Sequence, residues 1–275
     1  RNVDFVIEFQ TDAEFGAVIM NKMNQAGIPV VAIDIPMPEA GFFGVNNPRA
    51  GFMGGSYLAQ AAVARYGMDA VMSGYFIEGE LPQSGPIPAM RTGGQIAGFR
   101  AALPDFPKDQ ILTFDSKNTL EESFTQTNNL LSRLPEGVPI RGTAINDQAT
   151  TGILRAAQQD GREMITVVGL GGDEGETLAN EPDFVAAVGS FPERYGNSLN
   201  PMAMATLAGE DLPDAVLINH TMVTPGNICE FNAEVACQDV EVIDYSFPKD
   251  GFLAHLEALR SDPSLADVQN LIPTQ

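Results

Sequence analysis

The sequence predicts an α/β protein made of two lobes, each built on a doubly wound parallel sheet, joined by crossover hinge strands. Apolar runs rich in β-branched residues alternate with segments of helical period, and this order is typical of parallel sheets with helices on both faces. The chain has 275 residues, which is enough for two compact lobes with separate cores. Two stretches, 35–55 and 220–227, interrupt the alternation with proline and glycine, and we interpret them as crossings between the lobes.

Strands and helices are expected in regular alternation. The apolar runs 3–9 and 28–34 flank the amphipathic segment 13–25 and predict two strands with a helix between them. After the first crossing, strands are expected at 70–76, 111–114, 140–145, 165–170, 185–191 and 215–219. The amphipathic segments between the strands predict helices at 49–65, 92–103, 120–134, 148–159 and 194–207. Beyond residue 227 the sequence predicts one strand-like run followed by two short helices.

These elements divide into three segments. Residues 1–41 are expected to belong to the N-terminal lobe, residues 42–221 to the C-terminal lobe, and residues 222–275 to a crossover and tail returning toward the N-terminal lobe. Only two βα steps precede the first crossing, and two strands do not make a stable sheet. The first lobe is therefore expected to lack about 60 residues at its N-terminus, at about 30 residues for each βαβ unit. The tail is expected to complete or brace that lobe.

The composition excludes several classes of function. The formal net charge is −21, whereas binding to nucleic acid or to an anionic membrane surface begins with Lys and Arg side chains that neutralise phosphates. The sequence contains no apolar run long enough to span a bilayer, so no direct membrane insertion is expected. With 44% hydrophobic and 19% charged residues, the chain has the balance of an ordinary folded protein.

The run VVGLGGDEGE, residues 167–176, places glycines after a β-branched strand, where a nucleotide-binding protein would keep its phosphate loop. A dinucleotide fingerprint needs glycine at its first, third and sixth positions, and here the sixth position is Glu174. The carboxylates of Asp173, Glu174 and Glu176 would also repel a phosphate from a helix N-terminus. We therefore interpret Gly171 as part of a turn at the carboxyl end of a strand, and we expect no cofactor.

Two cysteines, Cys229 and Cys237, lie close together near the C-terminus. Their spacing permits a disulfide across a hairpin or short loop, which would indicate an oxidising compartment. Two unpaired buried thiols are the alternative. The chain has only two histidines, His220 and His255, and neither lies near a cysteine pair or a second histidine, so no metal site is expected.

Polar residues follow most of the expected strands, at the end where parallel sheets bind ligands. They are Gln10, Asp12, Asp34, Asn46, Asn47, Asp115, Asn118, Asn146, Asp147, the turn at Gly171, Ser190, Asn219 and His220. They include no serine elbow, no histidine beside a nucleophile and no basic cluster for phosphoryl transfer, so no enzymatic activity is expected. Amides and carboxylates with aromatic neighbours such as Phe9, Phe42 and Tyr75 suit neutral hydroxylated ligands, because hydrogen bonds hold hydroxyl groups while rings cover apolar faces.

Five stretches carry a resemblance to a known family. They are AGIPVVAIDIP (26–36), FFGVNNPRAGFMGGSYLA (42–59), RTGGQIAGFRAAL (91–103), GTAINDQATTGILRAAQ (142–158) and ITVVGLGGDEG (165–175). In these stretches the chain resembles, from about residue 3 to residue 226, the type I periplasmic substrate-binding proteins of ABC transporters of the ribose and galactose kind. The fold of that family is shared with the effector domains of lactose-repressor-like regulators.

The resemblance implies that a ligand binds in a cleft between the lobes. The strand ends and the resemblance together predict the ligand-binding residues Gln10, Asp34, Asn47, Arg91, Gln95, Asn118, Asn146, Gly171 and Ser190. Asp34 and Asn146 fall on ligand positions of the family, and Asn47 or its neighbour Asn46 falls on the hinge that faces the cleft.

The chain also departs from the family at three of these positions and at Ile35. Gln95 stands where the family usually offers an arginine to the ligand, and Arg91, one turn earlier, is the expected substitute. Gly171 stands in place of the usual strand-end aspartate, Ser190 in place of a glutamine, and Ile35 in place of a common arginine. These departures argue against ribose or galactose as the ligand and leave the two-lobed binding protein intact.

Several of these residues have a structural alternative. Asp34 could cap a turn, Asn146 could cap a helix, and Arg91 could be a solvated helix residue. Asp147 is expected to cap a helix rather than to contact ligand, and His220 is expected to be a hinge residue rather than an acid or base.

The resemblance implies a non-enzymatic solute receptor. Its lobes are expected to close on a sugar or polyol, and its closed form to be recognised by an ABC transporter permease. We expect a monomer in the periplasm or another extracytoplasmic space, without cofactor or nucleic acid. The alternative is the ligand-sensing effector domain of a lactose-repressor-like transcription regulator. The acidity, the cysteine pair and the long tail favour the exported receptor.

Overall fold

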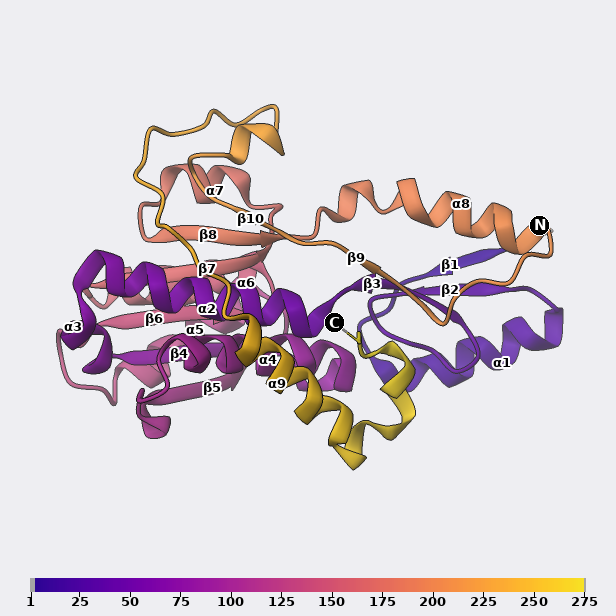
Figure 1. Cartoon of the computed structure of the whole chain (residues 1–275), viewed down its shortest axis with the longest axis horizontal. Helices are drawn as coiled ribbons and strands as arrows, with labels where there is room; N and C mark the ends of the chain where they lie inside the picture. The colour runs from indigo at the N-terminus through magenta and orange to yellow at the C-terminus, as the bar shows by residue number, and fades with distance from the viewer. Residues whose placement is uncertain (1–2, 275) are drawn as a thin grey trace.

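The computed structural model describes residues 3–274, which form two lobes side by side (Figure 1). The first lobe, on the right in Figure 1, contains strands β1 (Val6–Glu8), β2 (Val30–Ile33), β3 (Gly41–Val45) and β9 (Ala215–Ile218), and helices α1 (Gly16–Ala26) and α8 (Gly196–Leu207). Its strands are ordered β1-β2-β3-β9, and all neighbours are parallel.

The second lobe has a larger sheet. Its strands are β4 (Tyr75–Glu80), β5 (Ile111–Asp115), β6 (Ile140–Ala144), β7 (Ile165–Gly171), β8 (Phe184–Gly189) and β10 (Thr221–Val223). They are ordered β10-β8-β7-β6-β4-β5, and only β10 is antiparallel to its neighbour. Its helices are α2 (Asn47–Tyr66), α3 (Met68–Met72), α4 (Pro86–Ala102), α5 (Leu120–Leu131), α6 (Asp147–Gln159) and α7 (Gly175–Asn180). Together the two sheets confirm the predicted architecture of two lobes with parallel sheets.

A tail follows β10. It contains a disulfide between Cys229 and Cys237, then an extended stretch, then helix α9 (Lys249–Ser261) and the 3-10 helix η6 (Pro263–Leu271). In Figure 1 the tail runs over the second lobe, and α9 then descends toward the gap between the lobes, with the C-terminus near β3.

The strands of the first lobe bury apolar side chains on both faces. Along β2, Val30 and Ala32 pack with Met20 of α1, while Val31 packs on the opposite face with Leu199 of α8. Side chains alternate between the faces of a strand, so a continuous apolar run is what a sheet covered on both faces requires.

Glycines allow α2 and α4 to pack with their backbones in close approach. A side chain at Gly51 would collide with the carbonyl oxygen of Arg91, and one at Gly55 would collide with that of Gln95. Because glycine has no Cβ, the glycine-rich face of α2 fits directly against α4. This packing fixes the position of Arg91 relative to the first turn of α2.

The structure corrects the predicted lobe boundaries. The range 42–221 was expected to form the C-terminal lobe, but β3 and β9 pair with each other in the sheet of the first lobe, where Phe42 lies opposite Ala215. The chain therefore crosses between the lobes three times: from β3 to α2, from β8 to α8, and from β9 to β10. Local patterns do not show this pairing, because its partners are far apart in the sequence.

Three local expectations also differ from the structure. The apolar run 70–76 was predicted as one strand, but its first part lies in α3 and β4 begins only at Tyr75. Short apolar runs fit a buried helix as well as a strand, and Gly74 separates the two elements here. Strands β3 and β10 were absent from the strands predicted from apolar runs, because β3 contains two glycines and β10 has only three residues; the resemblance alone placed a hinge strand at β3.

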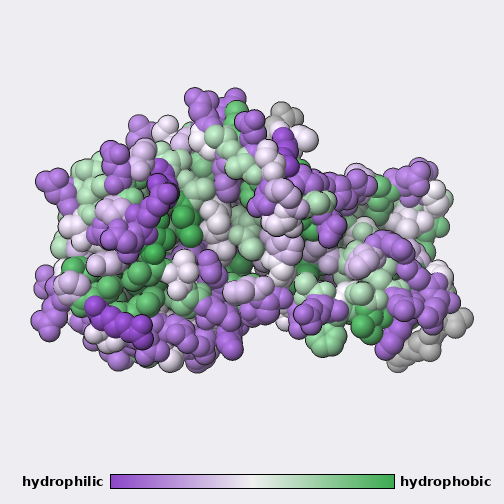
Figure 2. All heavy atoms as spheres, turned by 90° about the horizontal axis from the view of Figure 1, so that it is seen from below, coloured by the Kyte–Doolittle hydropathy of each residue, from purple (hydrophilic) through white to green (hydrophobic). Residues whose placement is uncertain are grey.

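The surface reflects the acidic composition. Seen from below, hydrophilic atoms are spread over both lobes, while apolar atoms gather mainly on the wider lobe at the left (Figure 2). Within residues 3–274, no helix combines the length and apolar character needed to cross a membrane.

Glu78 of β4 is expected to destabilise the fold as pH rises. Its side chain is fully buried, and neither carboxylate oxygen has a hydrogen-bond partner in the described residues. Burial, and then the charge of Glu80, raise the pKa of Glu78 well above its usual value. The folded state therefore holds this proton after the unfolded chain has lost it, and stability falls with rising pH by about 1.4 kcal/mol per unit above an unfolded pKa of about 4.3.

The replacement Glu78→Gln removes this titration. We expect its free energy of unfolding in urea to exceed that of the wild type at pH 7, and the difference to shrink as the pH approaches 4.5. The exposed Glu136→Gln is the control and should show no such trend. A Glu78→Gln protein less stable than the wild type at pH 7 would contradict a protonated Glu78.

Candidate functional site

One histidine joins all three connections between the lobes. His220 lies on the third connection, just after β9, and its Nε2 accepts a hydrogen bond from the backbone N–H of Asn46 on the first connection, at 3.1 Å. Its Nδ1 lies 3.1 Å from the carbonyl oxygen of Gly189, the last residue of β8, where the second connection begins. A carbonyl can only accept, so Nδ1 carries the proton and Nε2 its lone pair. Burial lowers the pKa of His220 to about 4, so the ring is neutral at neutral pH.

Arg91 of α4 lies next to these connections. Its Nε donates to Oδ1 of Asn47 at 2.8 Å, and its Nη1 donates to the carbonyl oxygen of Ile145 at 2.7 Å. Burial lowers the pKa of Arg91, while the nearby charges of Asp34, Tyr195 and Asp147 oppose that effect. Within residues 3–274 its Nη2 makes no hydrogen bond. Arg91 is thus held by the second lobe and faces charged groups from both lobes.

Asp34 brings a carboxylate from the first lobe, directly after β2. It has a left-handed backbone with φ of 59°, and its Oδ1 accepts from the backbone N–H of Val45 at 2.9 Å. Gly44 makes room for it, because a side chain there would collide with Asp34. Burial raises the pKa of Asp34, and the charge of Arg91 opposes the rise. A left-handed aspartate is uncommon and is often found where a site holds its backbone in place.

Asn146 and Asn118 lie together in the second lobe, after the carboxyl ends of β6 and β5, the strands on either side of β4. Asn146 is the N-cap of α6, since its Oδ1 accepts from the N–H of Ala149 at 2.8 Å, and its Nδ2 donates to Oδ1 of Asn118 at 2.9 Å. Asn118 is also left-handed, with φ of 63°. Asn146 therefore caps a helix, as one of its two predicted roles required. A contact with ligand would be a second role of the same side chain.

The turn at Gly171 is anchored by a buried carboxyl group. Oδ2 of Asp147 accepts from the N–H groups of Gly172 at 2.7 Å and of Asp173 at 3.1 Å. Burial, and then the charge of Asp173, raise the pKa of Asp147 to about 8. Asp147 was expected to cap a helix, but Asn146 is the cap and Asp147 ties α6 to this turn instead.

Ser190 and Tyr195 lie on the second connection. The Ser190 hydroxyl donates to the carbonyl oxygen of Gly171 at 3.3 Å, which links the two strand ends. Tyr195 is only 9% exposed and meets Phe43 edge to face at 5.0 Å. Burial, and then the charge of Asp34, raise the pKa of Tyr195. Sequence reasoning missed Tyr195, and its only signal was an aromatic residue just after the second connection.

The structure buries Gln95 inside the second lobe. Its side chain is fully buried, and its Nε2 donates to Oγ1 of Thr143 at 2.6 Å and to the carbonyl oxygen of Ala144 at 3.0 Å. These bonds place its amide nitrogen in the packing between α4 and β6, whereas its Oε1 is buried without a partner in the described residues. Ligand binding by Gln95 stays a prediction. The glycine contact with α2 draws this part of α4 into the interior.

Gln10, just after β1, has two amide atoms that are buried and without a partner in the described residues. The adjacent carbonyl of Thr11 accepts from the hydroxyl of Ser84 in the second lobe at 2.7 Å. Gln10 therefore lies beside a direct hydrogen bond between the lobes. Ligand binding by its amide stays a prediction.

The described residues contain no group of three or more side chains suited to hold a metal ion. The groups around Arg91 are instead carboxylates, amides, a guanidinium and a phenol from both lobes. Such a set can donate to and accept from the hydroxyl groups of a ligand, since each hydroxyl does both.

The amino-acid sequence matches the periplasmic binding protein domain over residues 1–211, which is well over half of the chain. The chain belongs to the periplasmic binding protein domain family. The ribose import binding protein RbsB of Escherichia coli (strain K12) is 26% identical to this family member over 214 residues, which cover 76% of this chain and 68% of RbsB.

Solved structures share the fold of this periplasmic binding protein domain. An ABC transporter solute binding protein from Bacillus halodurans C-125 has a TM-score of 0.68 and 21% identity, over 84% of this chain and 78% of that one. An ABC transporter periplasmic solute binding protein from Actinobacillus succinogenes 130z has a TM-score of 0.65 and 18% identity, over 81% of this chain and 77% of that one. The resemblance to the type I periplasmic fold is therefore confirmed.

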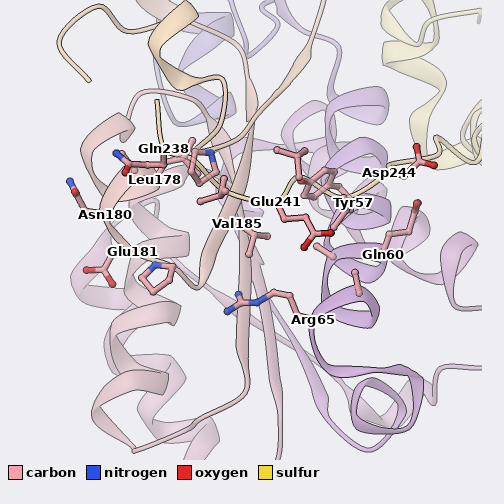
Figure 3. A pocket seen from close by; sticks show the side chains of 18 residues that line it. Tyr57, Gln60, Arg65, Leu178, Asn180, Glu181, Val185, Gln238, Glu241 and Asp244 are labelled. Carbon is pink, nitrogen blue, oxygen red and sulfur yellow. The ribbon is translucent and has the colours of Figure 1, made fainter. Parts of the chain in front are cut away.

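A pocket of about 820 Å³ lies elsewhere, on the second lobe of the periplasmic binding protein domain (Figure 3). Tyr57 and Arg65 of α2 line it from one side and Leu178 and Asn180 of α7 from the other, and Glu241 of the tail also lines it. Its lining contains none of the predicted ligand residues, and its tail wall lies outside the matched residues 1–211. We therefore place the candidate site at the connections and not in this pocket.

Proposed function

We propose that this chain is an extracytoplasmic solute-binding protein that captures a sugar or polyol between its lobes and delivers it to the permease of an ABC transporter. The observation that carries the proposal is the group of polar side chains around Arg91, where Asp34 comes from the first lobe and Asn47 from the second. A ligand bound by groups of both lobes gains contacts when the lobes close. Closure would then follow as a shift of population toward the closed state.

The chemistry of the group supports a neutral ligand with several hydroxyl groups. Asp34 can accept from one hydroxyl, and Nη2 of Arg91 can donate to another, since no protein acceptor in the described residues occupies it. Hydrogen bonds to charged groups are the stronger ones, which suits capture of a solute that water also binds well. Ile145 and Asn47 hold the guanidinium in place before the ligand arrives.

The relatives support the same ligand class. RbsB is named for ribose import, D-allose is bound in the Actinobacillus structure, and myo-inositol is bound in the Bacillus structure. Gln95 and Gly171 depart from the ribose-type pattern, and Gln95 is buried in packing. We therefore propose the class, a sugar or polyol, and not ribose itself.

The proposal also covers the cellular compartment and the oligomeric state of the protein. The disulfide between Cys229 and Cys237 supports an oxidising, extracytoplasmic compartment such as the periplasm. We propose that the receptor acts as a monomer, without cofactor or catalysis, and that the permease recognises its closed form.

A thermal-shift screen against monosaccharides, polyols, nucleosides and amino acids tests the function. A sugar or polyol at 100 times its dissociation constant is expected to add about 2.7 kcal/mol to the free energy of unfolding and to raise the melting temperature. Prolonged incubation with the bound solute should leave it chemically unchanged, as mass spectrometry can verify. A shift only with nucleosides or amino acids, or turnover of the solute, would overturn the proposal.

A further inference from the structure

The tail after β10 forms a bridge between the lobes that is separate from the three connections. It lies outside the residues that match the periplasmic binding protein domain. We call residues 247–272, which contain α9 and η6, the clamp. Figure 1 shows the clamp beneath the molecule, passing from α4 of the second lobe toward the first lobe.

The stretch before the clamp is fixed to α2 of the second lobe. The Tyr245 hydroxyl lies 2.8 Å from Oγ of Ser56. Gln60 makes two hydrogen bonds with the backbone of Ser246, donating to its carbonyl oxygen at 2.9 Å and accepting from its N–H at 3.0 Å. These bonds hold the extended chain in register along α2, so the clamp starts from a defined point.

The clamp itself packs against α2 through aromatic side chains. Phe252 of α9 lies 5.3 Å from Phe52 of α2, measured between ring centroids, and Phe247 lies 5.6 Å from the same ring. Arg49 lies over the ring of Phe247 at 5.3 Å. The second lobe therefore holds the near end of the clamp by packing as well as by hydrogen bonds.

The far end of the clamp reaches the first lobe. Leu265, Val268 and Ile272 are buried in one apolar cluster that also contains Phe42 of β3. Ala215 and Leu217 of β9 pack against the same cluster, and its members from the second lobe include Ile87 and Met90 of α4. Side chains from both lobes and from the clamp thus share one core.

We propose that the clamp is a conformational latch that favours the closed arrangement of the lobes, the one described here, in which the Ser84 hydroxyl of the second lobe donates to the carbonyl oxygen of Thr11 of the first at 2.7 Å. The lobes cannot rotate apart while both remain attached to this cluster, so opening has to detach η6 from one of them. Detachment exposes buried apolar side chains to water, which disfavours the open state. The latch is a property of the ligand-free chain.

The latch also bears on ligand affinity, and this consequence rests on the proposed function. A receptor that spends more time closed binds its ligand more tightly, because the apparent dissociation constant is the intrinsic one divided by the closed fraction. When release of the clamp lowers the closed fraction about tenfold, the dissociation constant for a sugar or polyol is therefore expected to rise about tenfold.

Distance measurement between spin labels on the two lobes tests the latch without any ligand. Labels at Lys22→Cys on α1 and Asn129→Cys on α5 are both exposed, and the native cysteines are paired with each other. The clamp variant is Leu265→Ser with Val268→Ser, both buried, and its matched control is Ala266→Ser with Asp267→Ser, both exposed on the same helix. Single Ile272→Ser provides a milder variant should the double change reduce folding.

The wild type and the control are expected to share one narrow distance distribution, and the clamp variants to show a longer, broader one with unchanged far-UV circular dichroism. An unchanged distribution in folded clamp variants would overturn the latch. If the distances lengthen but no sugar or polyol binds to any variant or to the wild type, the latch stands and the proposed function fails. If ligand binds and the distances do not change, the function stands and the latch fails.

Discussion

Replacement of Arg91 with methionine is expected to weaken sugar or polyol binding about 100-fold. Methionine keeps an unbranched chain of similar bulk but removes the charge that faces Asp34 and every donor of the guanidinium. A hydrogen bond from a charged group contributes about 1.5–3 kcal/mol, and the upper value corresponds to about 100-fold in the dissociation constant. Isothermal titration calorimetry with a solute identified by the thermal-shift screen measures the change.

The matched control is Arg155→Met on α6. Arg155 is exposed, pairs with Glu181 at 2.7 Å and lies outside the candidate site. Its replacement should leave the dissociation constant unchanged and remove only surface interactions: a hydrogen bond with Gln158 and the ion pair with Glu181, which contributes about 0–1 kcal/mol to stability. Equal affinities for Arg91→Met and the wild type, with both proteins folded, would place the ligand away from Arg91.

The second large effect is a loss of stability in acid that originates at His220. Its folded pKa of about 4 lies below the unfolded value of about 6.5, mainly because the ring is buried. Between these values the unfolded chain binds more protons than the folded one, so this contribution is complete above pH 6.5 and disappears as the pH falls through 4. The shift corresponds to roughly 3 kcal/mol at most. Protonation of Nε2 also breaks its hydrogen bond with the N–H of Asn46.

Nuclear magnetic resonance can follow this titration directly. His255→Gln leaves His220 as the sole histidine, and we expect its imidazole to stay neutral, with the proton on Nδ1, down to about pH 4. Urea unfolding of His220→Gln should show a weaker dependence on pH between 4 and 6.5 than the wild type. The stability of a His220→Leu protein at pH 7 should be lower by about 1–3 kcal/mol than that of the wild type, because leucine leaves the N–H of Asn46 without its acceptor. An imidazole midpoint near pH 6.5 would contradict the role of His220.

Local sequence patterns predicted most helices and strands, because the formation of these elements depends mainly on residues close together in the sequence. The β-branched run that became β7 is apolar on both faces, as a central parallel strand must be. The amphipathic segment that became α5 needs only its own spacing of apolar residues. The apolar runs alone did not indicate β3, which the resemblance placed as a hinge strand, since its glycines weaken the strand signal and its pairing with β9 supplies the stabilisation.

The candidate site was predicted in part. Asp34, Asn47 and Arg91 were named from the sequence, and the structure brings them within electrostatic or hydrogen-bond reach of one another. Tyr195 and the link between His220 and Asn46 could not be predicted, because each depends on which segments become neighbours after the chain crosses between lobes.

The fold class, the alternation of strands and helices, and the polar residues that end the strands could be predicted without coordinates, because each follows from spacing along the chain. Only the tertiary structure decided that Gln95 is buried in packing while Arg91 faces both lobes. The reason is the glycine contact between α2 and α4, which sets how α4 is rotated. The tertiary structure likewise decided that the tail joins an apolar cluster shared by both lobes, since that cluster assembles side chains from five separate helices and strands.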